Sequence, residues 1–433
     1  MMSKSKLSVA LSEHEPVPRM PETIPETGLD FGFLSDLALK IVYSDTNCTS
    51  ERVADKIKLP LGIAEDLLRH LYREKLIEIK GRINLQSNSY SILDRGLQRV
   101  HRLLDVSSYI GPAPVSIEDY SDMVRNQEQA RPPTTPILIE SAMKNLVLPE
   151  STVKLLGLVV DSRRSLFLSG PPGCGKTTIA KALHNALEGD IWVPYAFEAG
   201  GQVIRVFDGH HHELVSDPPA ARYDQRWLRV RRPLIVVGGE LTIETMDLIY
   251  SHTVRFYEAP FQVKANGGVL LIDDFGRQRV DPHDLLNRWI VPLENRIEYL
   301  TLHTGKKLEV PFEQLLVFAT NLNVNDLVDE AFLRRMGYRL FIDPPRIDTY
   351  ALVLERYIQS IGLEYDPDLA EMLLLRYQRE NRLMKYCDPR DLVERCIDIC
   401  KYENRPPTVD RNLLEQAWVN YFGSHSIQGR SSD

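Results

Sequence analysis

The stretch LFLSGPPGCGKT at residues 166–177 decides the fold of this chain. Its apolar start predicts a short buried strand, and residues 178–187 continue as an amphipathic helix. The glycine-rich segment between them fits the pattern G-x-x-x-x-G-K-[ST], in which backbone N–H groups and a helix N-terminus face a phosphate. Because strand, loop and helix follow one another in the required order, the stretch predicts a nucleotide-binding α/β domain with a parallel sheet.

Each residue of this loop has an expected role. Lys176 is expected to reach the β- and γ-phosphates of ATP, and Thr177 to ligate Mg²⁺. The other positions expected to contact the nucleotide are Gly170, Pro171, Pro172, Gly173, Cys174, Gly175 and Thr178. Cys174 is expected to be a small loop residue, and the alternative is that nearby N–H dipoles lower the pKa of its thiol and make it oxidisable. ATP and Mg²⁺ are therefore the predicted cofactors.

A second apolar run, residues 269–272, ends in two adjacent carboxylates, Asp273 and Asp274. A run without alternation suits a central parallel strand, and such sheets bind ligands at the carboxyl ends of their strands. We expect Asp273 to complete the Mg²⁺ shell and Asp274 to orient and polarise the attacking water. A solvated helix cap is the alternative reading of Asp274.

Three further polar positions follow in the chain. The apolar run at residues 315–319 ends in Thr320 and Asn321, and the Asn321 amide is expected to face the γ-phosphate or the water. Residues 329–335 predict a helix that carries Arg334 and Arg335. Arg390 lies near the start of another predicted helix, in the small helical domain.

These elements, in this order, resemble the AAA+ ATPase superfamily over residues 137–422. The segment 170–177 resembles its Walker A motif, and 270–274 its Walker B motif. Thr320-Asn321 looks like sensor 1, and Arg390 is placed like sensor 2 on a helical lid. The resemblance implies Mg²⁺-dependent ATP hydrolysis by a P-loop core with a parallel sheet and a C-terminal lid.

The resemblance also implies a homo-oligomeric ring, usually a hexamer. In such a ring Arg335 is placed like the arginine finger that touches the γ-phosphate of the neighbouring subunit, and Arg334 is the alternative. The alternative is that Arg334 and Arg335 are ordinary surface arginines with no role in hydrolysis. The chain departs from the family at Asp273-Asp274, where Asp-Glu is usual. The shorter carboxylate of Asp274 lies further from the water, which implies slower hydrolysis or a switch in place of a motor.

Composition narrows the class of protein. The chain has 52 Lys and Arg against 60 Asp and Glu, a net charge of −8, which argues against a nucleic-acid coat. Five cysteines in 433 residues predict no disulfide framework, and hence a reducing, cytoplasmic location. The sequence starts without a long apolar stretch and nowhere approaches a membrane-spanning run, so we expect neither a signal peptide nor a membrane span.

Proline-rich segments and changes of periodicity divide the chain. The predicted order is a disordered tail (1–27), a winged-helix-like domain (28–110), a linker (111–136), the AAA+ α/β ATPase domain (137–345), a helical lid (346–422) and a flexible tail (423–433). Within residues 28–110, three helices precede a hairpin whose turn is expected near Gly81, which resembles a winged helix. In the roughly ninety residues between the Walker A and Walker B motifs we expect an inserted, strand-rich segment that either faces a ring pore or extends the sheet.

Two regions bear on the partner. The winged-helix-like region carries a nearly balanced charge, which favours a protein partner over DNA, although DNA remains open. The arginine-rich segment, defined as residues 222–232, interleaves aromatic residues with Arg222, Arg226, Arg229, Arg231 and Arg232. Such a segment is able to grip nucleic acid, an acidic polypeptide, or carboxylates at a subunit interface.

The predicted function is therefore ATP hydrolysis coupled to remodelling or chaperoning of a protein client or adaptor. One alternative is a DNA-binding regulator or loader-like switch that uses the winged helix and the arginine-rich segment. A second alternative is an ATP-binding scaffold with negligible turnover.

Overall fold

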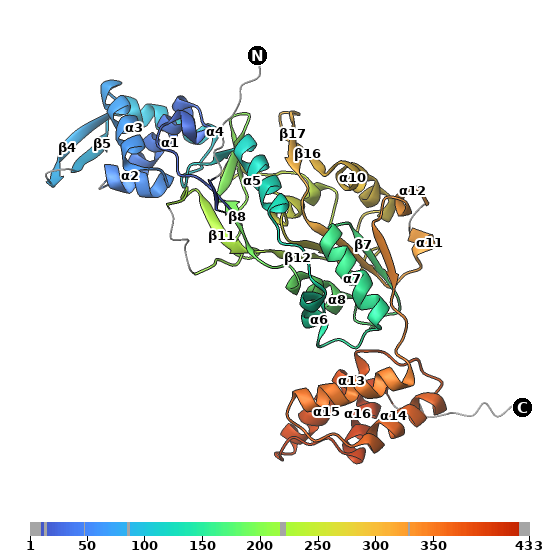
Figure 1. Ribbon diagram of the computed structural model, residues 1–433. Helices are drawn as coiled ribbons and strands as arrows, with labels where there is room; N and C mark the ends of the chain where they lie inside the picture. Colours follow the sequence, from blue (N-terminus) through green and yellow to red (C-terminus); the bar gives the residue numbers. More distant parts are fainter. Residues whose placement is uncertain are drawn as a thin grey trace, which may run out of the picture.

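The computed structural model describes residues 10–12, 15–46, 48–84, 87–216, 222–327 and 330–423. A small domain of helices and a β-hairpin lies at one end (blue in Figure 1) and a helical domain at the other (orange to red), with the larger sheets between them. Among the described helices, none is both long enough and apolar enough to cross a membrane.

A five-stranded parallel sheet forms the centre of the nucleotide-binding region. Its strands follow the order β12 (Leu234–Val237), β15 (Val269–Ile272), β18 (Leu315–Thr320), β7 (Leu166–Ser169) and β19 (Tyr338–Phe341), and every neighbouring pair is parallel. The three central strands β15, β18 and β7 are buried along their whole length, because helices cover both faces. This confirms the predicted α/β class with a parallel sheet.

The helices divide between the two faces of this sheet. On one face the apolar residues of α6 (Pro136–Met143), α7 (Glu150–Ser162) and α8 (Lys176–Asn185) pack against the strands. On the other face Leu285 and Trp289 of α10 (Pro282–Asn295) belong to the core. Three short helices complete the region: α9 (Phe261–Lys264), α11 (Val324–Leu327) and α12 (Glu330–Leu333). Since β7 leads directly into α8, the glycine-rich loop lies at the carboxyl edge of the sheet.

The inserted segment is rich in strands, as predicted. It contributes β8 (Asp190–Pro194), β9 (Ala196–Ala199), β10 (Gln202–Arg205), β11 (Trp227–Arg231), β13 (Ile249–Ser251) and β14 (Phe256–Glu258). These strands pair mainly with one another and share a core with the hairpin of β16 (Ile297–Thr301) and β17 (Lys307–Pro311). They therefore form a region of their own beside the central sheet.

The predicted linker at 111–136 is wrong for most of its length. Its residues form β6 (Val115–Ser116), which is parallel to β9, and α5 (Ile117–Gln129). Tyr120 of α5 is buried and stacks on Phe197, and Gln127 donates to the carbonyl of Trp192. The Gly/Pro clusters mark only the two ends, because the residues between them form a helix with an apolar face.

The predicted disordered tail is wrong for residues 15–27. They contain β2 (Glu15–Val17), which is antiparallel to β1 (Ala10–Ser12), and a 3₁₀ turn, η1 (Pro25–Thr27). The carbonyls of Pro18 and Thr27 accept hydrogen bonds from the arginine-rich segment, which explains why this proline-rich stretch is ordered. The rest of the predicted tail, residues 1–9 and 13–14, and residues 424–433 of the C-terminal tail lie outside the described residues.

The N-terminal domain has the predicted order of three helices and a hairpin. Its elements are α1 (Phe31–Ser44), β3 (Cys48–Thr49), α2 (Ser50–Ile57), α3 (Leu61–Arg73), β4 (Ile77–Asn84), β5 (Ser87–Ile92) and α4 (Asp94–Val106). The side chains of Asp30 and Thr49 cap α1 and α2. Gly81 lies inside β4 at a pairing irregularity and not at the turn. The winged-helix assignment stays a prediction.

The C-terminal region is helical, as predicted. It consists of α13 (Ile347–Ser360), α14 (Pro367–Arg379), α15 (Asp388–Tyr402) and α16 (Arg411–Phe422). These four helices bury a core of their own, with Tyr350, Leu354 and Trp418 among its residues. We call this region the lid, because it closes one side of the cavity described next.

Candidate nucleotide site

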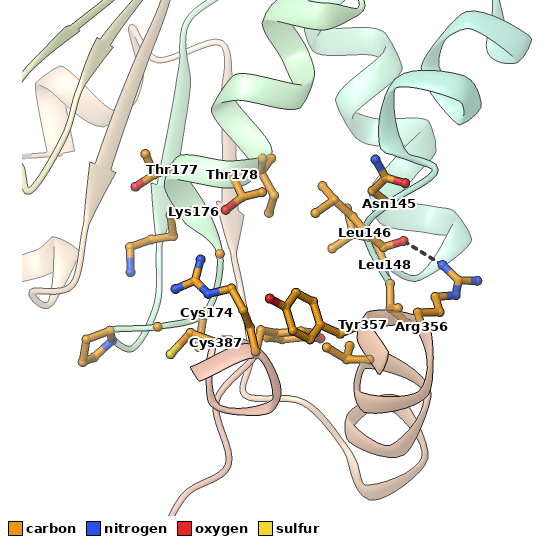
Figure 2. A pocket seen from close by; sticks show the side chains of 18 of the residues that line it. Asn145, Leu146, Leu148, Cys174, Lys176, Thr177, Thr178, Arg356, Tyr357 and Cys387 are labelled. Carbon is orange, nitrogen blue, oxygen red and sulfur yellow. Dashed lines mark hydrogen bonds between the residues drawn. The ribbon is translucent and has the colours of Figure 1, made fainter. Parts of the chain in front are cut away.

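A cavity of about 840 Å³ lies at the carboxyl edge of the central sheet. Its volume falls within the roughly 300–1,000 Å³ that small-molecule sites occupy. The glycine-rich loop, Asp273-Asp274 and Asn321 line it from the core, and residues of α13 and α15 line it from the lid. Figure 2 shows Lys176, Thr177 and Thr178 on one side of the cavity, and Tyr357 and Cys387 of the lid region beside them. The structure therefore brings the two sequence motifs to one cavity.

Two glycines of the loop are required by their surroundings. Gly170 has a φ of 148°, and a Cβ atom there would lie 2.4 Å from the carbonyl oxygen of Ile342. Gly173 has a φ of 79°, and a Cβ atom there would lie 2.7 Å from Sγ of Cys387. L-residues rarely adopt such angles. The loop thus keeps its backbone at the cavity surface because side chains are excluded.

Lys176 is held at the base of the loop. Its Nζ donates to the carbonyls of Gly170 at 2.8 Å and Pro171 at 3.0 Å. Burial lowers the pKa of the Lys176 ammonium, and the nearby carboxylates of Asp273 and Asp274 oppose that shift. The lysine therefore lies where a phosphate entering the loop would meet its charge.

Thr177 and Asp273 meet although 96 positions separate them in the chain. The Thr177 hydroxyl donates to Oδ2 of Asp273 at 2.8 Å, because β7 and β15 end at the same edge of the sheet. A hydroxyl and a carboxylate oxygen are hard ligands of the kind that Mg²⁺ takes alongside substrate phosphates. The residues present therefore fit the predicted metal.

Asp274 has an unusual backbone conformation. Its φ is 49°, in the left-handed region, and its N–H donates to Oδ1 of Asp273 at 3.1 Å. The residue is exposed and follows β15 in a turn, so it does not cap a helix. Non-glycine residues held at such angles concentrate at functional sites.

Asn321 follows β18 and lines the same cavity. Its Oδ1 is buried and has no hydrogen-bond partner among the described residues. The preceding Thr320 donates its hydroxyl to the carbonyl of Phe275 at 2.7 Å, which ties this loop to the turn after β15. A buried acceptor without a partner is costly, so a donor from a ligand or a water would satisfy it.

Arg390 lines the cavity from the first turn of α15. Its Nη2 donates to Oδ1 of Asp391 at 2.8 Å, and this hydrogen bond raises the pKa of the guanidinium. The lid also contacts the loop directly, because the N–H of Cys387 donates to the carbonyl of Gly173 at 3.1 Å. The predicted lid arginine therefore lies beside the loop.

The predicted finger residues lie elsewhere. Neither Arg334 nor Arg335 lines the cavity of its own chain, and Arg335 pairs with Glu294 of α10 at 2.5 Å. The helix expected at 329–335 is shorter than predicted: α12 ends at Leu333, so both arginines follow it, and residue 329 lies outside the described residues. The role of Arg335, or alternatively Arg334, as an arginine finger for the neighbouring subunit stays a prediction.

The cavity contains residues that the motifs did not indicate. A segment before α7, residues 144–148, forms one wall, and Arg356 of the lid donates to its carbonyls of Lys144 and Leu146, each at 3.4 Å. Figure 2 shows this link next to Asn145 and Leu148. Tyr357 adds an aromatic ring to the same wall. In the sequence, only the apolar run at 146–148 before Pro149 could have indicated this wall of the cavity.

Cys174 is a buried residue of the glycine-rich loop. Its side chain is buried, and burial raises the pKa of the thiol more than the nearby lysines lower it. A protonated thiol is a poor nucleophile. Both observations favour the expected reading of Cys174 as a small loop residue over that of an oxidisable thiol.

The arginine-rich segment is engaged inside the chain. Arg226 is buried, pairs with Asp224 at 2.8 Å and donates to the carbonyls of Thr27 and Pro114. Arg232 is buried too, and its guanidinium donates to backbone carbonyls. The remaining pairs are Arg229 with Asp190 and Arg231 with Glu213. These contacts favour an intrachain structural role over a grip on nucleic acid.

Two families match the chain. Residues 166–344 match the ATPase family associated with various cellular activities (AAA), and residues 346–420 match a domain of unknown function (DUF8689). The first match begins at β7 and ends just after β19, so it contains the whole central sheet.

Relatives of known identity match more weakly. The type IV methyl-directed restriction enzyme EcoKMcrB subunit of Escherichia coli strain K12 is 28% identical over 96 residues, which cover 22% of this chain and 21% of that protein. This chain thus matches about a fifth of that relative's length.

Solved structures show a limited likeness. The RuvB Holliday junction branch migration motor of Thermotoga maritima is 16% identical, with 66% of this chain and 72% of that chain covered and a TM-score of 0.40. NtrX from Brucella abortus in complex with ATP is 14% identical, with 70% and 62% covered and a TM-score of 0.42. These TM-scores are too low to carry an argument. The family match over residues 166–344, which include the glycine-rich loop and both carboxylates of the cavity, identifies this region as an AAA ATPase domain.

Proposed function

We propose that this ATPase hydrolyses ATP in a Mg²⁺-dependent reaction within a ring of identical subunits, and that hydrolysis drives remodelling of a protein partner. The observation that carries the chemical part is the 2.8 Å contact between Thr177 and Asp273 in the cavity that Lys176 also lines. It supports one site for a triphosphate and its metal.

The residues of the cavity have separable roles in this proposal. Lys176 binds the β- and γ-phosphates, and the Gly170–Gly175 backbone surrounds them. Thr177 and Asp273 hold Mg²⁺, which when bound neutralises charge on the phosphate oxygens. Asp274 orients the attacking water and accepts its proton, and Asn321 donates its amide to the water or the γ-phosphate. Arg390 contacts the nucleotide from the lid and so links lid position to the bound nucleotide.

Substitution of Asp274 tests the hydrolytic role. Asp274→Asn keeps the size of the side chain and removes its capacity as a base, so we expect kcat to fall by about 10²–10⁴-fold. ATP binding should persist, because the phosphate contacts are intact. Equal turnover in the variant and the wild type would remove Asp274 from this role. Negligible turnover in the wild type at every protein concentration would favour the scaffold alternative.

The ring part rests on the placement of Arg334 and Arg335 outside their own cavity. In a ring, Arg335 would leave Glu294 and neutralise charge on the neighbour's γ-phosphate, with Arg334 as the alternative. We expect Arg335→Ala to bind ATP and to hydrolyse it slowly, and wild-type activity per subunit to rise with protein concentration. The measurement is ATPase rate against oligomeric state by light scattering. Activity independent of assembly would contradict a finger in trans.

Three features support a protein partner. The chain is acidic overall, four of the five arginines in its arginine-rich segment are bonded within the chain, and α3 of the winged-helix-like domain exposes both Asp66 and Arg69, which pair with each other. A pull-down with the Asp274→Asn variant in ATP should retain the client, because slow turnover prolongs the bound state.

All five cysteines are free, which supports the reducing, cytoplasmic setting of this proposal.

A DNA-binding regulator is the second candidate, since α3 and the β4–β5 hairpin have the order of a winged helix. A titration of duplex binding against salt separates the two candidates. Binding that weakens steeply with salt would favour the regulator, whereas no binding even at about 50 mM salt would exclude phosphate contacts of useful strength.

A further inference from the structure

The turn after β15 is organised by one side chain that no motif predicts. Gln278 donates its amide to the carbonyl of Asp273 at 3.1 Å and to that of Asp274 at 3.4 Å. Its Oε1 accepts the N–H of Gly276 at 2.8 Å. A single amide therefore joins three residues of the turn through both its donor and its acceptor.

This turn needs such support at Asp274. The φ of 49° at Asp274 lies in a region that residues with a Cβ atom rarely adopt, and its side chain is exposed. The carbonyl of Asp274 accepts from the N–H of Arg277 at 3.0 Å as well as from Gln278. Gln278 thus acts on the backbone of both carboxylate residues of the cavity, and Asp274 is the one of the two whose backbone lies in the left-handed region.

The far side of the turn packs against the loop of Asn321. A Cβ atom at Gly276 would lie 2.7 Å from Leu327 and 2.9 Å from Leu322, so the turn approaches that loop closely. The N–H of Phe275 donates to the carbonyl of Ala319 at 2.8 Å. The turn is therefore fixed to β18 through Phe275, whose N–H and carbonyl both bond to that strand, and Gln278 fixes the part of the turn that carries Asp274.

We propose that Gln278 is a positioning residue for hydrolysis, which holds Asp274 in its left-handed backbone conformation so that its carboxylate meets the attacking water. This inference rests on the proposed role of Asp274. Gln278 itself touches neither the nucleotide cavity nor the reacting atoms, because it does not line the cavity. Its loss should therefore slow turnover without weakening ATP binding.

The test is a double-mutant cycle between Gln278 and Asp274. Gln278→Met keeps the length of the side chain and removes its hydrogen bonds, and we expect kcat to fall by about ten- to a hundred-fold, the range that small misplacements of catalytic groups produce. The Kd for ATP and the Tm should stay at the wild-type values. In the Asp274→Asn background, Gln278→Met should change kcat no further, because the carboxylate that it positions is absent. His283→Ala, an exposed change at the start of α10, is the matched control and should keep full turnover.

Each outcome decides between the two proposals. If Asp274→Asn is slow and Gln278→Met is as fast as wild type, the positioning role is overturned and the proposed function stands. If Asp274→Asn turns over at the wild-type rate, the proposed function fails first. If Gln278→Met slows both backgrounds equally, Gln278 acts through the loop in general, and the inference is also overturned.

Gln278→Glu guards against a misfolded variant. It keeps an acceptor for the N–H of Gly276 and loses the donors to the two aspartate carbonyls, so it should show the same kcat loss with ATP binding intact. Full turnover in Gln278→Glu would overturn the inference, since the donated hydrogen bonds would then be dispensable.

Discussion

The nucleotide cavity and the arginine-rich segment both contain several charged residues. In the cavity these charges face open space, whereas in the arginine-rich segment the most buried ones are hydrogen-bonded within the protein. In the cavity, Lys176 and Asp273-Asp274 line an open space of about 840 Å³. In the arginine-rich segment, Arg226 is 2% exposed and its guanidinium is saturated by Asp224 and two backbone carbonyls. The difference teaches that charge in a sequence indicates a site only where the fold leaves that charge something external to bind.

Loss of Arg226 should give the largest effect and should act on stability. Arg226→Leu leaves the Asp224 carboxylate buried without its partner, and breaking a buried pair in this way costs about 3–5 kcal/mol. We expect a lower Tm and faster proteolysis near residues 15–27, because Arg226 donates to the carbonyl of Thr27. Thermal unfolding monitored by tryptophan fluorescence measures it.

The control for this prediction is the paired change Asp224→Leu with Arg226→Leu, which should recover part of the lost stability, because no buried charge is then left alone. An unchanged Tm in the single variant would contradict the structural role of Arg226. The arginine-rich segment would then again be a candidate binding site for nucleic acid or an acidic polypeptide.

Loss of Lys176 should act on activity and leave stability unchanged. Lys176→Ala removes a positive charge that faces the phosphates, and removal of one such group costs about 10²–10³-fold in kcat. The ATPase rate and the Tm, measured on the same preparation, separate this result from that of Arg226. Lys181→Ala, an exposed change on the same helix, is the matched control. A Tm drop as large as that of Arg226→Leu would break the contrast between the two regions.

Loss of Arg231 should give the smallest effect. Its pair with Glu213 is 3.4 Å long, and both side chains are about two-thirds exposed, at 69% and 67%. Exposed pairs contribute about 0–1 kcal/mol, so Arg231→Ala should barely change the Tm or the ATPase rate. If it abolished duplex binding that the wild type showed, the segment would have a nucleic-acid role after all.

The α/β core around the nucleotide site was predictable from the sequence, because the patterns that indicate it are formed by neighbouring residues. The glycine-rich loop dictates its own backbone, and uninterrupted apolar runs such as residues 269–272 indicate buried parallel strands. From these two facts, the meeting of Thr177 with Asp273 follows, since parallel strands end at one edge. The cavity walls at 144–148 and at Arg356 were not predictable, because they depend on where the lid packs against the core.

Corrections arose where a local pattern was ambiguous. The Gly/Pro clusters around residues 111–136 indicated a linker, yet Tyr120 buries its ring against Phe197 from a distant strand. The proline-rich residues 15–27 are ordered by hydrogen bonds from a segment about two hundred positions away in the chain. In each case a partner remote in sequence decided the outcome.

The sequence by itself determined the phosphate loop, the parallel strands and the carboxylates at their ends, because each depends on neighbouring residues and on a regular backbone. Only the tertiary structure decided which charges remain available. It placed Arg226 and Arg232 in the interior. It also gave Asp274 its left-handed backbone and joined the Asp274 carbonyl to Gln278 by a hydrogen bond. The physical reason is that desolvation and hydrogen-bond saturation depend on the three-dimensional surroundings of a group, which residue order alone does not specify.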